Sequence, residues 1–304
     1  MVDKAHGGAK RASSDASAGR QPGGQKLARV LGVPDMIVYG LIFMVPIAPM
    51  GIYGGVFHDS GGMPALAYLV GTGAMVFTAL SYSMLIKEFP ASGSVYAYTT
   101  RGMGKGIGFV SGWTLLLDYI LSPVLLYVVA STALSGIVPE VPAWAFAVAF
   151  VVFNTFVNVR GVQLANVVDK VALVLEILVL AVFVVLAVRW LATDPASHGF
   201  TLAPLYNPET FDPAVVASAA SLAVLSFLGF DGIATLSEEA KDGRRGPGRA
   251  MMASLAIIGT LFALQTYLAG CVSPDGAVFA SDPNNAFYLV AQVVGGRWLY
   301  VVCA

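Results

Sequence analysis

Apolar stretches of about 20 residues, long enough to cross a bilayer as a helix, alternate with short polar segments along most of the chain. We predict seven complete membrane spans, over residues 35–57, 62–86, 106–133, 142–159, 165–191, 213–236 and 250–273. An eighth apolar run resumes after Arg297 and reaches Ala304, about ten residues that cannot cross a hydrocarbon core of about 30 Å. The pattern predicts an all-α polytopic membrane protein, and we expect this chain to be a fragment of a longer one, interrupted early in its eighth helix.

Three polar segments frame these spans. Residues 1–30 are rich in Gly, Ala, Ser and basic residues without an apolar core, which predicts a disordered tail rather than a signal peptide, followed by a membrane domain over 31–304. Residues 91–105 are too polar to span and too aromatic for a plain linker, so we expect a loop with a short interfacial helix. Residues 193–213 contain several turn-forming Pro dipeptides and predict an extended outer connection.

Helix breakers lie in the middle of the first and sixth spans. Pro46, Pro49 and Gly51 predict an interruption near residues 46–51, because each proline removes a backbone hydrogen bond. Gly229 and Gly232 weaken the sixth span at a similar depth. A break facing lipid would leave polar backbone unsatisfied, so each break must face protein or a water-filled cavity. Such a break can be a packing kink alone, but a pair of interrupted spans five apart points to an inverted-repeat transporter site.

Composition agrees with a membrane protein and excludes several functions. The chain is 57% hydrophobic and 12% charged, against about 25% charged for an ordinary soluble domain, and its net charge of −1 does not favour nucleic-acid binding. Cys271 and Cys303 lie in apolar surroundings, and His6, His58 and His198 lie outside the spans. We therefore expect no metal, cofactor or intramembrane enzyme chemistry. The expected partners are a small solute and the lipid bilayer.

Basic residues predict the orientation of the chain. Of the 17 Lys and Arg residues, only Arg189 and Arg297 fall on the side of the membrane opposite the N-terminus, and that side carries mostly acids. Because cytoplasmic loops are enriched in Lys and Arg, we expect a cytoplasmic N-terminus in a plasma-membrane protein.

Acidic residues inside the spans are the candidate functional groups. Asp231 lies between the two glycines of span six, and Asp118 lies within span three, where a carboxylate costs about 2.5–3.5 kcal/mol to insert. Each could bind a cationic solute, or could be a neutral acid bonded to a neighbouring helix. Glu176 in span five is a third such acid, for which a proton-carrying role and an inter-helix role are equally open. Glu238 and Glu239 stand beside basic residues and suggest a gate or a loop ion-pair network.

Three motifs resemble the amino acid–polyamine–organocation permeases, most closely their putrescine importer branch. They are FPASGSVYAYTTRGMGKGIGFVSGW at 89–113, LLLDY at 115–119 and GFDGIATLSEEAKDGRRGPGRA at 229–250, and the resemblance extends from about residue 35 to the end. It implies ten core helices in two inverted five-helix repeats plus two further helices, with the first repeat at about 35–191 and the second starting at about 213–304. Discontinuous helices one and six would hold the solute between them.

The resemblance also implies roles for individual residues. The substrate-binding residues would be Pro46, Ile47, Ala48, Gly51, Asp118, Tyr119, Gly229, Phe230, Asp231 and Gly232, with Glu176, Glu238 and Glu239 in coupling or gating. Proton-coupled relatives often have a lysine at the position of Glu176, so the coupling ion, H+ or Na+, stays open. The family's usual Asn-Pro before Arg-Arg is replaced by Asp242-Gly243, which we expect to alter loop geometry more than transport.

These observations predict a secondary active transporter that imports an amino acid or a putrescine-like polyamine by alternating access. An exchanger or exporter of amino acids is the alternative within the same class. A receptor built on a transporter scaffold is a remote one, because the N-terminal tail offers no signalling domain.

Overall fold

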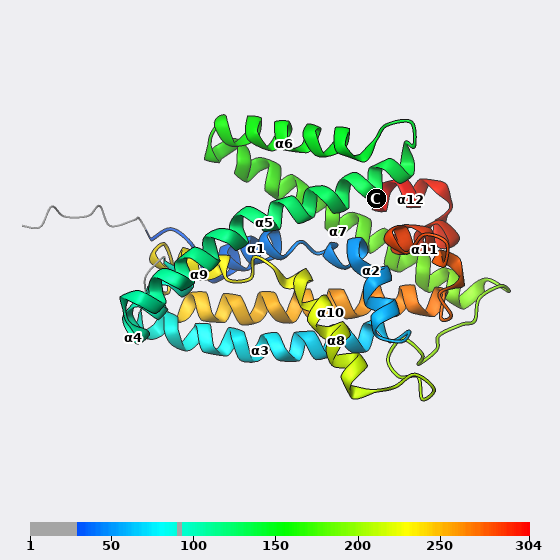
Figure 1. Cartoon of the computed structure of the whole chain (residues 1–304), viewed down its shortest axis with the longest axis horizontal. Helices are drawn as coiled ribbons and strands as arrows, with labels where there is room; N and C mark the ends of the chain where they lie inside the picture. The colour runs from blue at the N-terminus through cyan, green and yellow to red at the C-terminus, as the bar shows by residue number, and fades with distance from the viewer. Residues whose placement is uncertain (1–28, 90–92) are drawn as a thin grey trace, which may run out of the picture.

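The helices of the protein are described by a computed structural model that covers residues 29–89 and 93–304. The predicted disordered tail lies almost wholly outside this described part. The helices are α1 (Val33–Met44), α2 (Ala48–Asp59), α3 (Pro64–Glu88), α4 (Ser94–Met103), α5 (Lys105–Ile137), α6 (Ala143–Val159), α7 (Val162–Thr193), α8 (Pro213–Ala223), α9 (Gly232–Thr235), α10 (Gly246–Val272), α11 (Ala286–Gly295) and α12 (Arg297–Cys303). Short 3₁₀ turns connect several of them (Figure 1).

Most predicted spans are present as helices of membrane length. By length and apolarity α3, α5, α7, α10 and the segment Pro213–Glu238 can each cross a bilayer, and α1 with α2 form a sixth span when the bent pair is counted as one. The predicted span at 142–159 is α6, an apolar helix of only 17 residues, at the lower end of the crossing range. The eighth run begins as α12 at the predicted position.

The first span is broken, as the prolines predicted, but slightly earlier in the chain. Helices α1 and α2 meet at an angle of 52° across residues 45–47. Val45 has φ 48°, a backbone conformation that a β-branched residue rarely adopts. Pro49 is the second residue of α2, where its missing N–H costs nothing, so it starts the second half of the span rather than breaking it.

The sixth span is broken over a longer stretch. Helix α8 continues into the 3₁₀ turn η1 (Val224–Phe227), and the chain then becomes extended at Leu228 before α9 begins at Gly232. Gly229 has φ 85°, which glycine adopts without steric cost. The interruption in this span therefore depends on a backbone conformation that glycine at position 229 permits.

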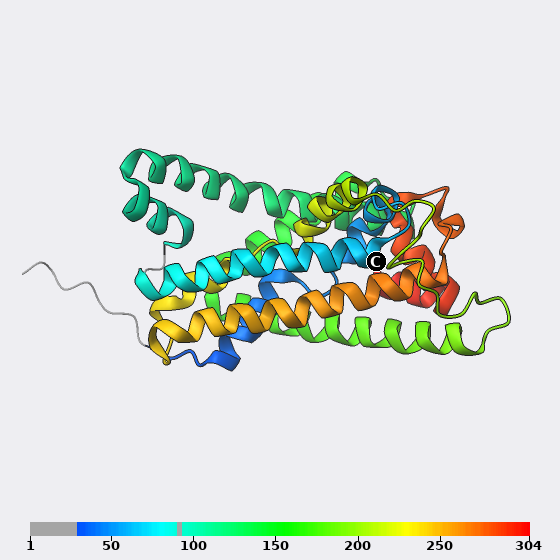
Figure 2. The same ribbon diagram turned by 90° about the horizontal axis from the view of Figure 1, so that it is seen from below.

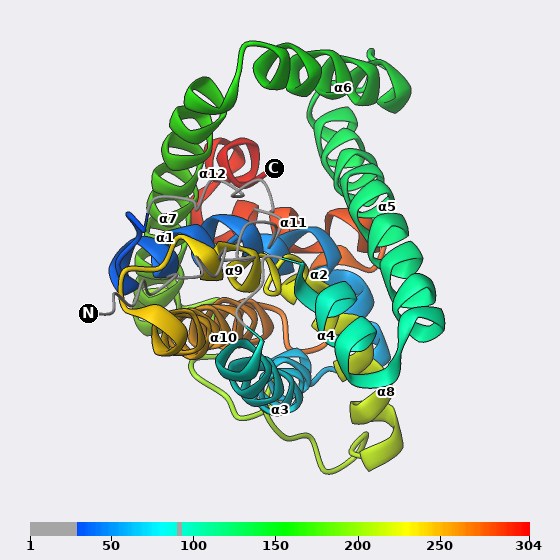
Figure 3. The same cartoon turned by 90° about the vertical axis from the view of Figure 1, so that its left-hand side faces the viewer.

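Helix α10 is the centre of the bundle. It runs beside α3 along most of its length and also packs against α1 (Figures 1 and 2). Its side chains Met251, Leu255, Ile258 and Phe262 are fully buried. In Figure 3, α5, α6 and α7 follow one another around the upper rim of the molecule. Many of their apolar side chains are exposed, as expected for helices in contact with lipid.

Two helices lie outside the predicted spans. Helix α4 is the short helix expected at 91–105, and it packs against the start of α5. Helix α11 was not predicted, because its sequence AFYLVAQVVG is apolar but only ten residues long, which is too short for a criterion of about 20 residues. The connection at 194–212 contains no helix, in agreement with the sequence. It lies with α11 at one end of the molecule, whereas α4 and the turn before α10 lie at the other (Figure 1).

Candidate functional site

The two broken spans touch each other at their interruptions. A Cβ added at Gly229 would lie 2.5 Å from the carbonyl oxygen of Phe43, and one at Gly232 would lie 2.7 Å from the Phe43 ring. Backbone of span six therefore packs directly against the last turn of α1. On the other side, the hydroxyl of Tyr68 on α3 lies 2.9 Å from that of Ser226 in η1. Because this pair is buried, its hydrogen bond holds the interruption in place.

Asp231 stands at the second end of the interruption in span six, directly before α9. Its Oδ2 atom accepts a hydrogen bond from Ser94 Oγ at 3.2 Å and a longer one from Tyr119 Oη at 3.4 Å. Ser94 is the first residue of α4 and Tyr119 lies on α5. The carboxylate therefore connects the break of span six to α4 and α5, whose donors lie 137 and 112 positions earlier in the chain. Neither donor neutralises its charge.

Asp118 is next to Tyr119 on α5 and forms one wall of the cavity between the breaks. Its Oδ1 atom accepts a hydrogen bond from Ser122 Oγ, one helical turn further on, at 3.0 Å. This central cavity has a volume of about 260 Å³. Of the predicted substrate-binding residues it is lined by Ala48, Gly51, Asp118, Tyr119 and Gly229.

A second cavity lies on the other side of Asp118. This inner cavity, of about 530 Å³, is lined by Asp118, Gly229, Phe230 and Asp231 among other residues. The central and inner cavities share Asp118, Leu228 and Gly229 as walls. Two carboxylates thus face one hollow, and no Lys or Arg is found among the described residues that line either cavity.

Gln265 is a residue of this region that the sequence analysis missed. It lies on α10, is fully buried, and its Nε2 donates a hydrogen bond of 3.0 Å to the carbonyl oxygen of Pro46 in the break of span one. A second, longer bond goes to Leu261 O, and its Oε1 has no hydrogen-bonding partner. An amide within the apolar sequence LFALQTYLAG was the signal that could have identified it, because buried amides need partners.

We predict that Gln265→Leu lowers the stability of the protein. The change leaves the buried Pro46 carbonyl without a donor, which costs about 1–3 kcal/mol, partly offset because the unpaired Oε1 is removed as well. The melting temperature of the detergent-purified protein is expected to fall, whereas Gln292→Leu, at an exposed glutamine of α11, should leave it unchanged. Equal melting temperatures for the two variants would contradict this role for Gln265.

Several predicted site residues lie outside both cavities. Pro46 turns its carbonyl to Gln265, and Ile47 packs against an apolar cluster. Glu176 is half-buried on α7, on the helix face that also carries Leu173 and Leu180. Gly232 contacts Phe43, as described above.

Glu238 and Glu239 lie in the turn between α9 and α10, also away from the cavities. The backbone carbonyl of Glu239 accepts a hydrogen bond from Leu31 N at 3.0 Å, and Lys241 N donates to Leu31 O at 2.8 Å. These two bonds attach the segment before α1 to the turn after α9. The proposed roles of Glu238 and Glu239 in gating stay predictions.

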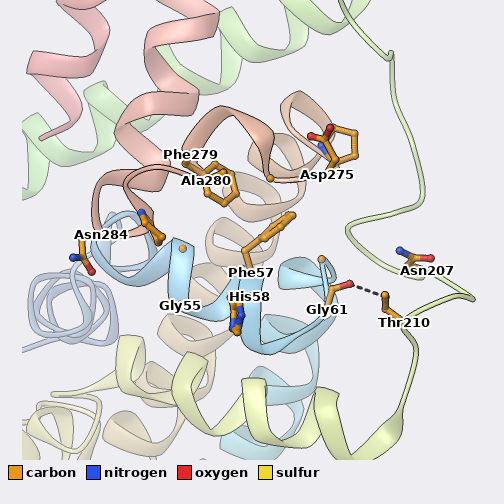
Figure 4. Close-up of a pocket in the computed structure, with 15 residues that line it drawn as sticks. Gly55, Phe57, His58, Gly61, Asn207, Thr210, Asp275, Phe279, Ala280 and Asn284 are labelled. Carbon is orange, nitrogen blue, oxygen red and sulfur yellow. Dashed lines mark hydrogen bonds between the residues drawn. The ribbon is translucent and has the colours of Figure 1, made fainter.

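A further cavity lies away from the two breaks. This outer cavity, of about 620 Å³, is bordered by the end of α2 and by the loops before α8 and α11, and it contains none of the predicted site residues (Figure 4). Within the described ranges, no group of three or more His, Cys, Asp or Glu side chains is placed to hold a metal ion. The chemistry of the candidate site therefore rests on Asp118, Asp231 and the backbone of the two breaks.

An all-helical membrane protein whose first and sixth spans are interrupted, with carboxylates where the breaks meet, has the architecture of secondary transporters. The model of the amino acid permease family matches residues 36–304. The chain belongs to this family, whose members are permeases rather than enzymes. The resemblance inferred from the sequence motifs is thus confirmed.

Individual relatives cover the same part of the chain. The low-affinity putrescine importer PlaP of Escherichia coli (strain K12) is 32% identical over 274 residues, which are 88% of this chain and 60% of that protein. The branched-chain amino acid permease BcaP of Bacillus subtilis (strain 168) is 25% identical over 91% of this chain and 62% of its own length. The vacuolar cationic amino acid transporter 2 of Arabidopsis thaliana is 27% identical over 90% and 47%. The chain therefore spans about half to three-fifths of the length of these relatives.

Proposed function

We propose that the protein is a secondary active transporter that imports a small cationic amine, with putrescine-like diamines as the favoured substrates. The observation that carries this proposal is the pair of carboxylates, Asp118 and Asp231, on one cavity whose described walls include no Lys or Arg. A cavity of this charge at the meeting point of two broken spans favours a cation and disfavours an anion.

The chemistry of a diamine fits this arrangement. An ammonium group that enters the membrane loses its hydration, and a carboxylate with hydrogen-bonding neighbours can replace it. Two carboxylates on different elements, α5 and the break before α9, offer one partner to each end of a short diamine. The apolar walls of the inner cavity, such as Leu115, Val224 and Phe227, suit the methylene chain between the two charges.

The names of two of the three relatives support a cationic solute, and the third is named for neutral amino acids. PlaP is named a putrescine importer, BcaP a branched-chain amino acid permease, and the plant relative a cationic amino acid transporter. An amino acid would also need a partner for its carboxylate. The N-terminus of α2, a helix of 12 residues that starts at the break of span one, provides a positive dipole end for such a group.

The remaining features of the transport cycle form part of the same proposal. The first repeat would comprise α1–α7 (about 35–191) and the second would begin at α8 (about 213). The basic end of the bundle, with the N-terminal segment and the turn before α10, would face the cytoplasm of a plasma-membrane protein. Coupling would use H+ or Na+, with Glu176 as a candidate group, and exchange or export of amino acids is the alternative mode.

Competition uptake tests the choice of solute. Cells that express the protein are given labelled putrescine with an excess of unlabelled putrescine, lysine or leucine, at two external pH values. We expect putrescine to compete strongly and leucine not at all, because leucine offers only one ammonium group and adds a carboxylate. Competition by leucine as strong as by putrescine would contradict the amine proposal and favour an amino acid transporter. A pH effect on the uptake rate would indicate proton coupling.

A further inference from the structure

Four cavities follow one another through the molecule, and each shares wall residues with the next. The outer cavity shares Asn284 with an intermediate cavity of about 270 Å³, which is lined by Gly51, Val128, Val129, Thr132, Asn284 and Tyr288. The intermediate cavity shares Gly51 and Val129 with the central cavity. The central cavity in turn borders the inner cavity at Asp118. Shared wall residues therefore place the four cavities next to one another in a series that ends at the two carboxylates.

Gly51 and Val129 form the boundary between the intermediate and central cavities. A Cβ added at Gly51 would lie 2.5 Å from Val129 Cγ1, which is closer than real atoms approach, so α2 and α5 touch here without a gap. Gly51 belongs to α2 and Val129 to the last third of α5. The contact at this boundary is between the backbone of Gly51 and a methyl group of Val129. A hydrophobic constriction of this kind excludes a hydrated cation when closed.

The part of the series outside this boundary has the polarity that an amine would need. In the intermediate cavity Thr132 donates its hydroxyl proton to Val128 O at 2.9 Å, and the amide of Asn284 is exposed. The outer cavity carries the exposed carboxylate of Asp275 and the imidazole of His58. No Lys or Arg is present among the described residues lining these two cavities, so a cation meets no fixed positive charge of that kind.

Specific contacts hold the segments around the outer cavity in place. Thr210 Oγ1 donates a hydrogen bond of 2.7 Å to Gly61 O, which attaches the connection before α8 to the turn after α2 (Figure 4). The rings of Phe57 and Phe279 meet edge to face at 5.0 Å between their centres. At Gly54 an added Cβ would overlap the carbonyl oxygen of Pro283, so α2 also packs closely against the segment that carries Asn284.

We propose that the outer, intermediate and central cavities are the access path of the solute, and that Gly51 and Val129 form the constriction that closes this path above the central cavity. This inference rests on the proposed transport function, because an access path has a role only in a transporter. The position of the constriction can nevertheless be tested without knowledge of the solute. It assigns Val129 a role in admitting solute rather than in binding it.

Thiol labelling of two positions on α5 tests the constriction. Thr132→Cys places a thiol in the intermediate cavity and Ser122→Cys places one in the central cavity, ten residues or about 15 Å along the same helix. Intact cells that express each variant are treated with a membrane-impermeant cationic methanethiosulfonate, and labelling of the parent protein is subtracted. We expect Thr132→Cys to react at least tenfold faster than Ser122→Cys.

The constriction is then opened by Val129→Ala in the Ser122→Cys background, which should raise the labelling rate severalfold. Val124→Ala, at an exposed valine of the same helix that lines none of the four cavities, is the matched control and should not change it. Equal reaction of Ser122→Cys and Thr132→Cys, or equal effects of the two valine variants, would overturn the proposal. Labelling of Thr132→Cys only from the cytoplasmic face would also overturn it.

A pair of compensating substitutions guards against variants that fold poorly. Gly51→Ala adds a methyl group against Val129 and should slow labelling at Ser122→Cys, and adding Val129→Ala to it should restore the rate by removing the opposing methyl groups. Restoration shows that the two positions act through their mutual contact. Failure of Val129→Ala to restore the rate would contradict the constriction. None of these labelling measurements uses a solute. A failure of the diamine proposal would therefore show only in the competition uptake experiment, and a failure of the constriction only in the labelling rates.

Discussion

Asp231→Asn is expected to abolish amine uptake while leaving the protein folded in the membrane. Asparagine has nearly the same shape, and its side-chain oxygen can still accept the hydrogen bonds from Ser94 and Tyr119. The change removes one negative charge from a cavity in which the solute's ammonium group would be desolvated. Loss of one partner from a buried charge pair costs about 3–5 kcal/mol. Binding should therefore weaken by about 100-fold or more.

The measurement is uptake of labelled putrescine, normalised to the amount of protein in the membrane. Asp194→Asn is the matched control, because Asp194 lies at the end of α7 and its Oδ1 only accepts a hydrogen bond from Ala196 N, which asparagine can also do. That variant should transport at the parent rate. Parent-level uptake by Asp231→Asn would remove Asp231 from the substrate site and favour the alternative of a neutral, structural acid.

The spans and their interruptions could be predicted because they depend on local sequence. Two prolines and two glycines identify the broken spans without knowledge of their surroundings. The exact break in span one could not be read in the same way. It falls at Val45–Ile47, where Val45 is held at a positive φ, and that conformation depends on tertiary contacts such as the bond from Gln265 to Pro46. Helix α11 was missed for a different reason. A criterion that looks for apolar runs of about 20 residues cannot distinguish a short apolar helix from an apolar loop.

In the candidate site too, some features depend on local sequence and others depend on the fold. A carboxylate in an apolar span stands out by its cost, so Asp118 and Asp231 were identified one by one. That both carboxylates line one cavity follows only from the fold. The same holds for the hydrogen bond that Ser94 donates to Asp231, because Ser94 and Asp231 are separated by 137 positions along the chain. Glu176 has the same free-energy cost of insertion into the membrane, but it lies on α7, outside the cavities. The insertion cost alone therefore does not distinguish a solute-binding acid from an acid with another role.

Gly229→Ala is expected to have an effect as large as the loss of Asp231, by a different route. At φ 85° an alanine is strained by about 1–2 kcal/mol, and its Cβ would lie 2.5 Å from the Phe43 carbonyl oxygen. Relief of this contact must move the break of span six away from α1, at a further cost of about 1–3 kcal/mol. Because Gly229 lines both the central and the inner cavity, this movement would displace the neighbouring Asp231 as well.

Two measurements distinguish this effect from that of Asp231→Asn. Gly229→Ala should lower both the melting temperature of the detergent-purified protein and the uptake, whereas Asp231→Asn should lower only the uptake. Gly73→Ala on α3 is the control, since an added Cβ there meets no atom within 4 Å and alanine favours a helix. If Gly229→Ala melts and transports like Gly73→Ala, then Gly229 does not hold the break, and the contact between the two interrupted spans does not define the site.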